Sequence, residues 1–185
     1  LAELQSWRET ESAPEDSAAT PPAGEKTDME ETAMDLVLYS DEDLPENVSM
    51  RQSILGFDHE TPVKGTLSSN FGYREHPVEG EERFHYGVDL AAGSGTAIYA
   101  TKSGTVTSAC YNEAYGYMVT INHADGYSSL YGHMTNYIVS AGDYVTQGQT
   151  IGYVGSTGWS TGPHLHFTIY YNGADVNPMN YVSMP

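Results

Sequence analysis

From residue 63 onward, short runs of β-branched and aromatic residues alternate with glycine-containing turns, and this texture restricts the fold more than any other feature. Runs of this kind, bounded by glycine or Asx turns, are typical of strands. The predicted strands are 96–100, 104–108, 117–121, 127–131, 144–145, 150–154 and 164–171. Asp125-Gly126 predicts a tight hairpin because both turn positions favour positive φ. The pattern indicates an all-β antiparallel sandwich or barrel.

The negative charge of the chain is concentrated in its N-terminal third. The formal net charge is −18, and residues 1–60 carry −13 of it, from 16 Asp or Glu against 3 Lys or Arg. Residues 1–35 are too poor in apolar side chains to order themselves, so we expect a flexible acidic tether. We expect residues 36–62 to form an arm or a short helix, which packs on a domain formed by residues 63–185. Without a basic patch, the chain is not expected to bind nucleic acid.

Two further features bear on location and redox chemistry. Cys110 is the one cysteine, so an intramolecular disulfide cannot form, and its strand context predicts a small buried side chain. No stretch approaches the roughly 18 apolar residues of a membrane helix. The first residue is Leu1 rather than Met, so we expect the natural N-terminus to lie upstream.

Metal-ligating residues occur at even spacings in three motifs, His85-Tyr-Gly-Val-Asp89, Tyr131-Gly-His133 and His164-Leu-His166. Residues two or four apart on a strand share a face, so His85 is expected beside Asp89, and His164 beside His166. A catalytic zinc site takes three His, Asp or Glu ligands and leaves one position for water. His85, Asp89 and one histidine of the last motif complete that set. The other histidine and His133 remain for proton transfer, which predicts a hydrolytic site with one Zn²⁺ ion.

We expect the remaining histidines, the arginines and the tyrosines to have structural rather than catalytic roles. His59, His76 and His123 have no partner at metal spacing, so we expect each to make ordinary hydrogen bonds. Arg74 and Arg83 are expected to form ion pairs rather than to contact substrate. The tyrosines as a group are expected to pack in the sheets.

Several motifs together resemble those of the lysostaphin/LytM-type peptidases, the M23 family of zinc endopeptidases. They span roughly residues 63–182 in the family's order: Phe71-Gly-Tyr-Arg-Glu-His-Pro77, His85-Tyr-Gly-Val-Asp89, Tyr131-Gly-His133, Gly155-Ser-Thr-Gly-Trp-Ser-Thr-Gly-Pro-His-Leu-His166 and Asn177-Pro178. The resemblance implies the duplicated hybrid motif fold, an antiparallel β fold with an open groove. By position, His85, Asp89 and His166 match the family's zinc ligands. His133 and His164 match its catalytic histidines.

The function that the resemblance implies is zinc-dependent cleavage of peptide cross-links or bridges in bacterial peptidoglycan. Such an enzyme acts outside the cytoplasm, at the cell wall or cell surface. Family members are often tethered to the membrane by a helix, which here would lie upstream of Leu1; the alternative is a secreted protein whose signal peptide has been removed. The main alternative is a non-catalytic adaptor in cell-wall remodelling or sporulation. Adaptors of this kind tend to lose site residues, whereas all five are present here. A zinc D,D-carboxypeptidase is a third possibility, which the His-x-His pattern fits less well.

Overall fold

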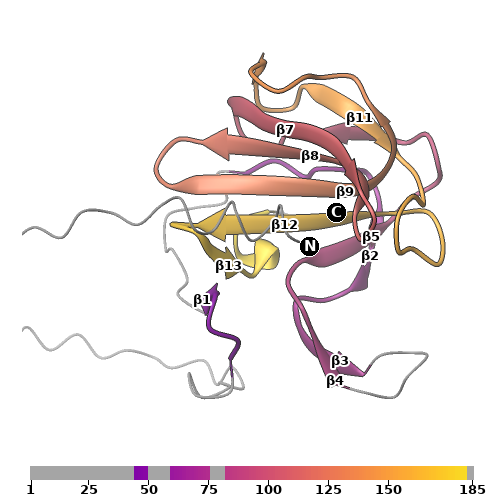
Figure 1. Cartoon of the computed structure of the whole chain (residues 1–185), viewed down its shortest axis with the longest axis vertical. Helices are drawn as coiled ribbons and strands as arrows, with labels where there is room; N and C mark the ends of the chain where they lie inside the picture. Colours follow the sequence, from indigo (N-terminus) through magenta and orange to yellow (C-terminus); the bar gives the residue numbers. More distant parts are fainter. Residues whose placement is uncertain (1–43, 50–58, 76–81, 183–185) are drawn as a thin grey trace, which may run out of the picture. The chain divides into compact units, whose positions relative to one another are not determined.

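The computed structural model of the chain describes residues 44–49, 59–75 and 82–182. Chain contacts separate residues 1–44 from a compact unit that begins at Pro45, and the described residues beyond Leu44 all belong to this unit. Its elements are β1 (Val48–Ser49), β2 (Thr66–Ser69), β3 (Gly72–Glu75), β4 (Glu82–His85), β5 (Val88–Ala91), β6 (Ala97–Tyr99), β7 (Gly104–Asn112), β8 (Gly116–His123), β9 (Tyr127–Tyr137), β10 (Tyr144–Val145), β11 (Thr150–Val154), β12 (His164–Tyr171), β13 (Ala174–Val176) and a 3₁₀ turn at Pro178–Asn180 (Figure 1).

The seven predicted strands are confirmed as β6 to β12, with ends that differ by a few residues. The predicted hairpin turn is also present, and Asp125 and Gly126 have positive φ values of 63° and 79°. Apart from the 3₁₀ turn, the described residues contain no helix, and none of them spans a membrane as a long apolar helix. The all-β class is therefore confirmed.

The large sheet forks in the middle of β9. Its main path runs β1-β13-β12-β9-β8-β7-β10, as Figure 1 shows for the central strands. Up to Gly132, β9 pairs with β12, and from Met134 onward it pairs with β11 instead. The residue between them, His133, has a φ of 59°, in the left-handed region that few residues other than glycine adopt. A change of strand partner thus coincides with a predicted site residue.

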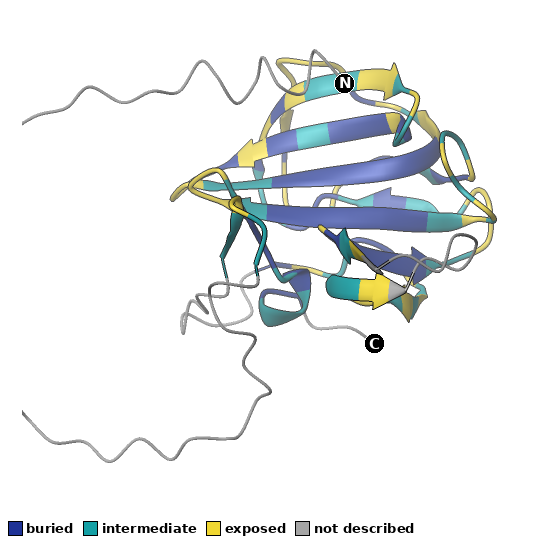
Figure 2. Ribbon diagram, turned by 60° about the horizontal axis from the view of Figure 1, so that its bottom comes forward, coloured by how far each residue is buried: buried dark blue, intermediate teal, exposed yellow. Residues whose placement is uncertain are grey.

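Alternation along β12 separates the core from the opposite face. Leu165, Phe167 and Ile169 are fully buried among the core side chains. Figure 2 shows the long strands of this sheet as predominantly buried ribbons. Because side chains alternate, His164 and His166 lie on the other face of β12. The core therefore fixes the register that presents both histidines on one side.

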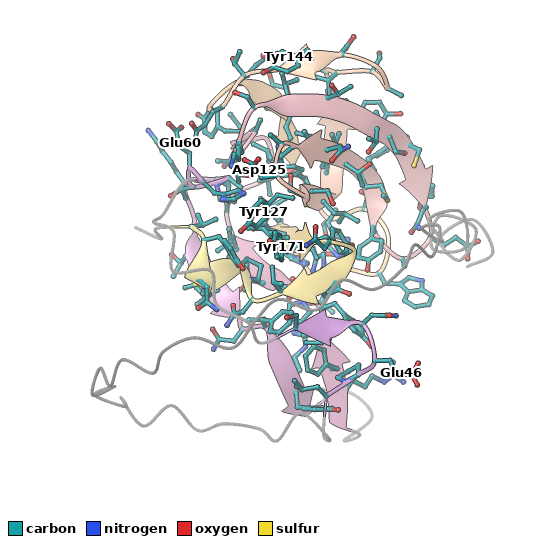
Figure 3. The ribbon with its side chains drawn as sticks, turned by 90° about the vertical axis from the view of Figure 1, so that its left-hand side faces the viewer. Glu46, Glu60, Asp125, Tyr127, Tyr144 and Tyr171 are labelled. Atoms are coloured by element: carbon teal, nitrogen blue, oxygen red, sulfur yellow. The ribbon has the colours of Figure 1, made fainter. Side chains whose placement is uncertain are left out.

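Tyrosines pack at the end of the sheet that is remote from these histidines. Tyr127 at the start of β9 and Tyr171 at the end of β12 are register partners. Their rings lie side by side with centroids 4.7 Å apart (Figure 3). Tyr131 lies nearer the histidines, opposite Phe167; it is fully buried, and its hydroxyl contacts Thr101 and Ser129. These tyrosines have the packing role that the sequence predicted.

Two N-terminal predictions concern residues that are largely outside the described ranges. The tether over residues 1–35 lies wholly outside them. Within 36–62, residues 44–49 and 59–62 are described; the first range contains β1, which pairs in parallel with β13, and in the second His59 forms a parallel bridge with Val182. The first range of the predicted arm therefore packs on the domain as a strand and not as a helix.

The prediction that Cys110 is buried is wrong. Its side chain is exposed on β7. The pairing of β7 with β8 shifts register between Val106 and Ser108. A bulge of this kind changes which face the following residues occupy, so alternation counted from the sequence does not hold beyond it.

Candidate metal centre

Three strands bring Asp89 and His166 together. His166 on β12 lies directly opposite Asp89 on β5 and opposite Gly132 on β9. Residues directly opposite in an antiparallel pair have neighbouring side chains on the same face. His166 Nδ1 consequently lies 2.9 Å from Asp89 Oδ1.

His85 reaches the same point by a different route from the one predicted. The expectation that His85 and Asp89 share one strand is wrong, because Tyr86 and Gly87 form a bend between β4 and β5. The bend still places His85 Nε2 3.2 Å from Asp89 Oδ1. Glycine is required there, since a Cβ on Gly87 would lie 2.5 Å from the Phe167 carbonyl oxygen.

The three donor atoms form a compact cluster with the geometry of a metal site. His85 Nε2 lies 3.2 Å from His166 Nδ1, and both approach the same carboxylate oxygen of Asp89. Donors about 2.0–2.2 Å from a tetrahedral zinc ion are about 3.3–3.6 Å apart, close to these separations. Within the described part of the chain, His85, Asp89 and His166 are the residues grouped closely enough to hold a metal ion.

The hydrogen bonds at the outer edges of the rings favour a cation between the donors. His85 Nδ1 lies 2.8 Å from the Asn70 carbonyl oxygen, which can only accept, so Nδ1 carries the proton and Nε2 a lone pair. His166 Nε2 lies 3.2 Å from the Thr168 hydroxyl, to which it can donate. With His166 in the tautomer that donates from Nε2 to Thr168, two nitrogen lone pairs and a carboxylate oxygen converge. A bound cation removes their mutual repulsion, and this donor set fits zinc.

Electrostatics hold two of the donors in their metal-binding protonation states. Burial by itself raises the pKa of Asp89, but His166 and His85, when their facing nitrogens carry protons in place of a metal ion, hold it well below its usual range. Burial lowers the pKa of His166, which keeps that imidazole neutral. The second carboxylate oxygen, Oδ2, pairs with Arg74 Nη1 at 3.5 Å. At neutral pH the site thus offers a carboxylate and a neutral imidazole.

His133 and His164 stand beside the donors as a second pair. Their ring centroids are 4.7 Å apart, and His164 Nε2 lies 3.8 Å from Asp89 Oδ1. His133 Nδ1 lies 2.7 Å from the Thr157 carbonyl oxygen, and His164 Nδ1 lies 2.8 Å from that of Gly162. Both Nδ1 atoms therefore donate, and each Nε2 is left to accept a proton. Burial lowers the pKa of His133 to about 4, so this imidazole is neutral at physiological pH.

These five residues lie in one groove of about 450 Å³. The groove is lined by Arg74, Phe84, His85, Tyr86, Asp89, Ala114, Tyr115, His133, Trp159, Ser160, Thr161, His164 and His166. Trp159 is 75% exposed, so an apolar surface is open to a ligand. The structure thus brings together every predicted site residue.

Sequence reasoning did not assign the groove positions of Arg74, Tyr115 and Trp159, among others. Arg74 forms the predicted ion pair, with Asp89, and it also lines the groove, where no role was predicted for it. Tyr115 comes from the β7–β8 turn, and its ring centroid lies 5.3 Å from that of His166. No spacing rule predicts this contact. Trp159 lies inside the Gly155–His166 motif, where an exposed aromatic residue was an available signal.

Two of the three histidines with predicted structural roles lie outside the cluster. His123 hydrogen-bonds the Ser103 carbonyl and the Ser129 hydroxyl, which agrees with its expected structural role. His59 is buried and contacts the ring of Tyr127. His76 lies outside the described residues.

Known proteins resemble this chain in both sequence and structure. A family model described as Peptidase family M23 matches residues 83–178. The chain is 44% identical over 130 residues to the DD-carboxypeptidase/endopeptidase Mpg of Neisseria meningitidis, covering 70% of this chain and 30% of that protein. It is 44% identical over 113 residues to the peptidoglycan DD-endopeptidase ShyC of Vibrio cholerae, covering 60% and 26%.

A solved structure, described as a zinc containing peptidase from Vibrio cholerae, has the same fold. It superposes with a TM-score of 0.61 at 34% identity, covering 67% of this chain and 39% of that one. The chain spans less than a third of the length of the two curated relatives above.

Proposed function

The chain belongs to peptidase family M23, and from that premise we propose that it is a zinc-dependent endopeptidase that cleaves peptide cross-links or bridges in bacterial peptidoglycan. The observation that carries the proposal is the convergence of His85, Asp89 and His166 beside two further histidines in one groove. The names of Mpg and ShyC, both DD-endopeptidases, support this substrate class. A wall substrate implies action outside the cytoplasm.

The metal would be held by His85 Nε2, His166 Nδ1 and a carboxylate oxygen of Asp89. Bound at three protein donors with one position open, zinc supplies Lewis acidity and brings the pKa of water toward neutrality. The chain's own contribution is orientation. The Asn70 carbonyl fixes the tautomer of His85, and Arg74 holds the second oxygen of Asp89.

Proton transfer would fall to His133 and His164. Neutral His133 can accept a proton at Nε2 from the attacking water, because its Nδ1 proton is engaged by the Thr157 carbonyl. His164 is held in the same tautomer by the Gly162 carbonyl. Once either ring is protonated, its Nε2–H can stabilise the oxyanion or protonate the leaving amine.

D,D-carboxypeptidase activity at the same site is a second candidate. The resemblance to Mpg favours it, since that relative is named both a carboxypeptidase and an endopeptidase. Both reactions break an amide with the same groups and differ in how much peptide lies beyond the scissile bond. The adaptor alternative has less support, because all five site residues are present and converge in the groove.

Digestion of purified peptidoglycan of several chemotypes, followed by mass spectrometry of the fragments, tests the proposal. The zinc-loaded protein should release peptides cut within cross-links or bridges, and His85→Ala should release none above the blank. Absence of cleavage in every chemotype, from protein with one zinc per chain, would contradict the enzyme and favour the adaptor.

A further inference from the structure

The groove contains one fixed positive charge, and it lies next to the candidate metal donors. Among the described residues that line the groove, Arg74 is the one Lys or Arg. Its Nη1 lies 2.6 Å from the Ser69 hydroxyl and 3.5 Å from Asp89 Oδ2. The side chain is nevertheless 43% exposed, so part of the guanidinium meets solvent in the groove.

These contacts hold one end of the guanidinium and orient the rest. Both contacts are made through Nη1, whereas an arginine side chain has five N–H donors in a rigid fork. That fork matches the two oxygens of a carboxylate, and charge-assisted pairs of this kind are the stronger hydrogen bonds. With respect to the described residues, the guanidinium is therefore held through Nη1, and its other N–H groups are oriented to bind an anion.

The surrounding charge makes this position selective. Residues 61–185 carry 9 Asp or Glu against 4 Lys or Arg, so the domain repels anions in general. Asp89 is the one acidic side chain among the described groove residues, and three histidines and Arg74 lie within 4 Å of its carboxylate. Of the described side chains in the groove, Arg74 is thus the one with a fixed positive charge that attracts an anionic group.

We propose that Arg74 forms a carboxylate subsite that binds the C-terminal carboxylate of the residue immediately beyond the scissile bond. This inference deepens the proposed function and rests on it. Backbone dimensions place that carboxylate carbon about 4 Å from the scissile carbonyl carbon. Arg74 contacts the carboxylate of Asp89, so it lies within one residue's reach of the donor cluster. The subsite lets the groove accept peptides that end one residue past the cut, as a carboxypeptidase requires.

The test compares two synthetic peptides, one ending in D-Ala-D-Ala with a free carboxylate and the other in the matching C-terminal amide. Their dissociation constants are measured by calorimetry on zinc-loaded protein in a His133→Asn background, which slows hydrolysis during the titration. Four proteins are compared: the background itself and the same background carrying Arg74→Gln, Arg74→Lys or Arg83→Gln. Arg83 is the control because it lies opposite Arg74 in the β3–β4 pair and does not line the groove.

We expect the background protein to bind the free carboxylate about tenfold more tightly than the amide. Arg74→Gln should abolish this preference with its zinc content unchanged, Arg74→Lys should keep part of it, and Arg83→Gln should keep all of it. An equal loss for both peptides, accompanied by loss of zinc, would overturn the subsite and make Arg74 a positioning residue for Asp89.

Equal binding of acid and amide by the background protein would overturn the inference as well, even where cross-links in peptidoglycan are cut. A preserved preference for the acid in a protein that cleaves no peptidoglycan would overturn the proposed function and retain the subsite. The two failures are therefore distinguishable.

Discussion

His133 combines an unusual backbone conformation with an unusual pKa. Its φ of 59° costs on the order of 1–2 kcal/mol for a residue other than glycine. Two bonds offset this strain: its N–H donates to the Tyr115 carbonyl at 2.6 Å, and its Nδ1 contacts the Thr157 carbonyl at 2.7 Å. In a regular strand its side chain would share the core face with Tyr131. The left-handed residue instead takes the ring into the groove.

Replacing His133 should separate chemistry from metal binding. Asparagine tolerates the left-handed region, so His133→Asn should preserve the fold at the fork of β9. Loss of the proton acceptor should lower kcat about 10²–10⁴-fold. Zinc content by elemental analysis should stay at one per chain, as in the wild type. Near-normal turnover in this variant would make His133 a packing residue.

Burial of His133 also predicts a pH dependence of stability. The pKa of His133 falls from 6.5 to about 4 in the folded chain, so on acidification the unfolded chain takes up its proton first. The free energy of unfolding of the chelated, metal-free protein should therefore fall as the pH drops from 6.5 toward 4, by about 3 kcal/mol from this group. Urea denaturation across that range measures it. His133→Asn should show a shallower dependence, and equal slopes would refute the attribution.

At the scale of elements, the site depends on the close approach of the β4–β5 bend to β12. A Cβ at Gly87 would meet the Phe167 carbonyl oxygen at 2.5 Å, the Thr168 hydroxyl at 2.6 Å and the His166 ring at 3.0 Å. The first of these is backbone and cannot move aside alone. The bend therefore sets the separation between His85 and His166.

Gly87→Ala should weaken both folding and metal binding. Forcing a methyl group into this contact typically lowers the free energy of unfolding by about 1–3 kcal/mol. It should also shift β12 away from the bend. The midpoint of urea denaturation and the zinc dissociation constant measure the two effects. Gly93→Ala is the matched control, because its Cβ would meet only the Thr96 hydroxyl, at 3.8 Å. Equal behaviour of the two variants would show that the approach is not needed.

The strands that were predicted from the sequence differ in residue composition from those that were missed. The strands β6 to β12 contain apolar and β-branched residues between clear turns, so local pattern was sufficient. The strands β3 and β4 read Gly-Tyr-Arg-Glu and Glu-Arg-Phe-His, with too little alternation to be recognised. The even spacing of histidine and aspartate in the motifs indicated the candidate ligands, although a bend rather than a single strand brings His85 and Asp89 together. Arg74 and Tyr115 were missed because tertiary contacts alone place them in the groove.

For the molecule as a whole, the described residues that line the groove all belong to the compact unit. The described residues that line it run from Arg74 to His166, well beyond the acidic segment 1–35. Deleting residues 1–35 should therefore leave kcat/KM on a soluble cross-linked peptide unchanged. Assays of the full chain and the truncated chain at equal zinc content check this. A large gain on truncation would show that the segment inhibits the site.

The central claim is that zinc bound by His85, Asp89 and His166 makes this groove hydrolytic. An anomalous difference map, recorded at the zinc edge from crystals of the zinc-loaded protein, tests it most directly. One peak should appear about 2.0–2.2 Å from His85 Nε2, Asp89 Oδ1 and His166 Nδ1. A fully occupied peak held by other residues, or no peak within the groove, would contradict the account.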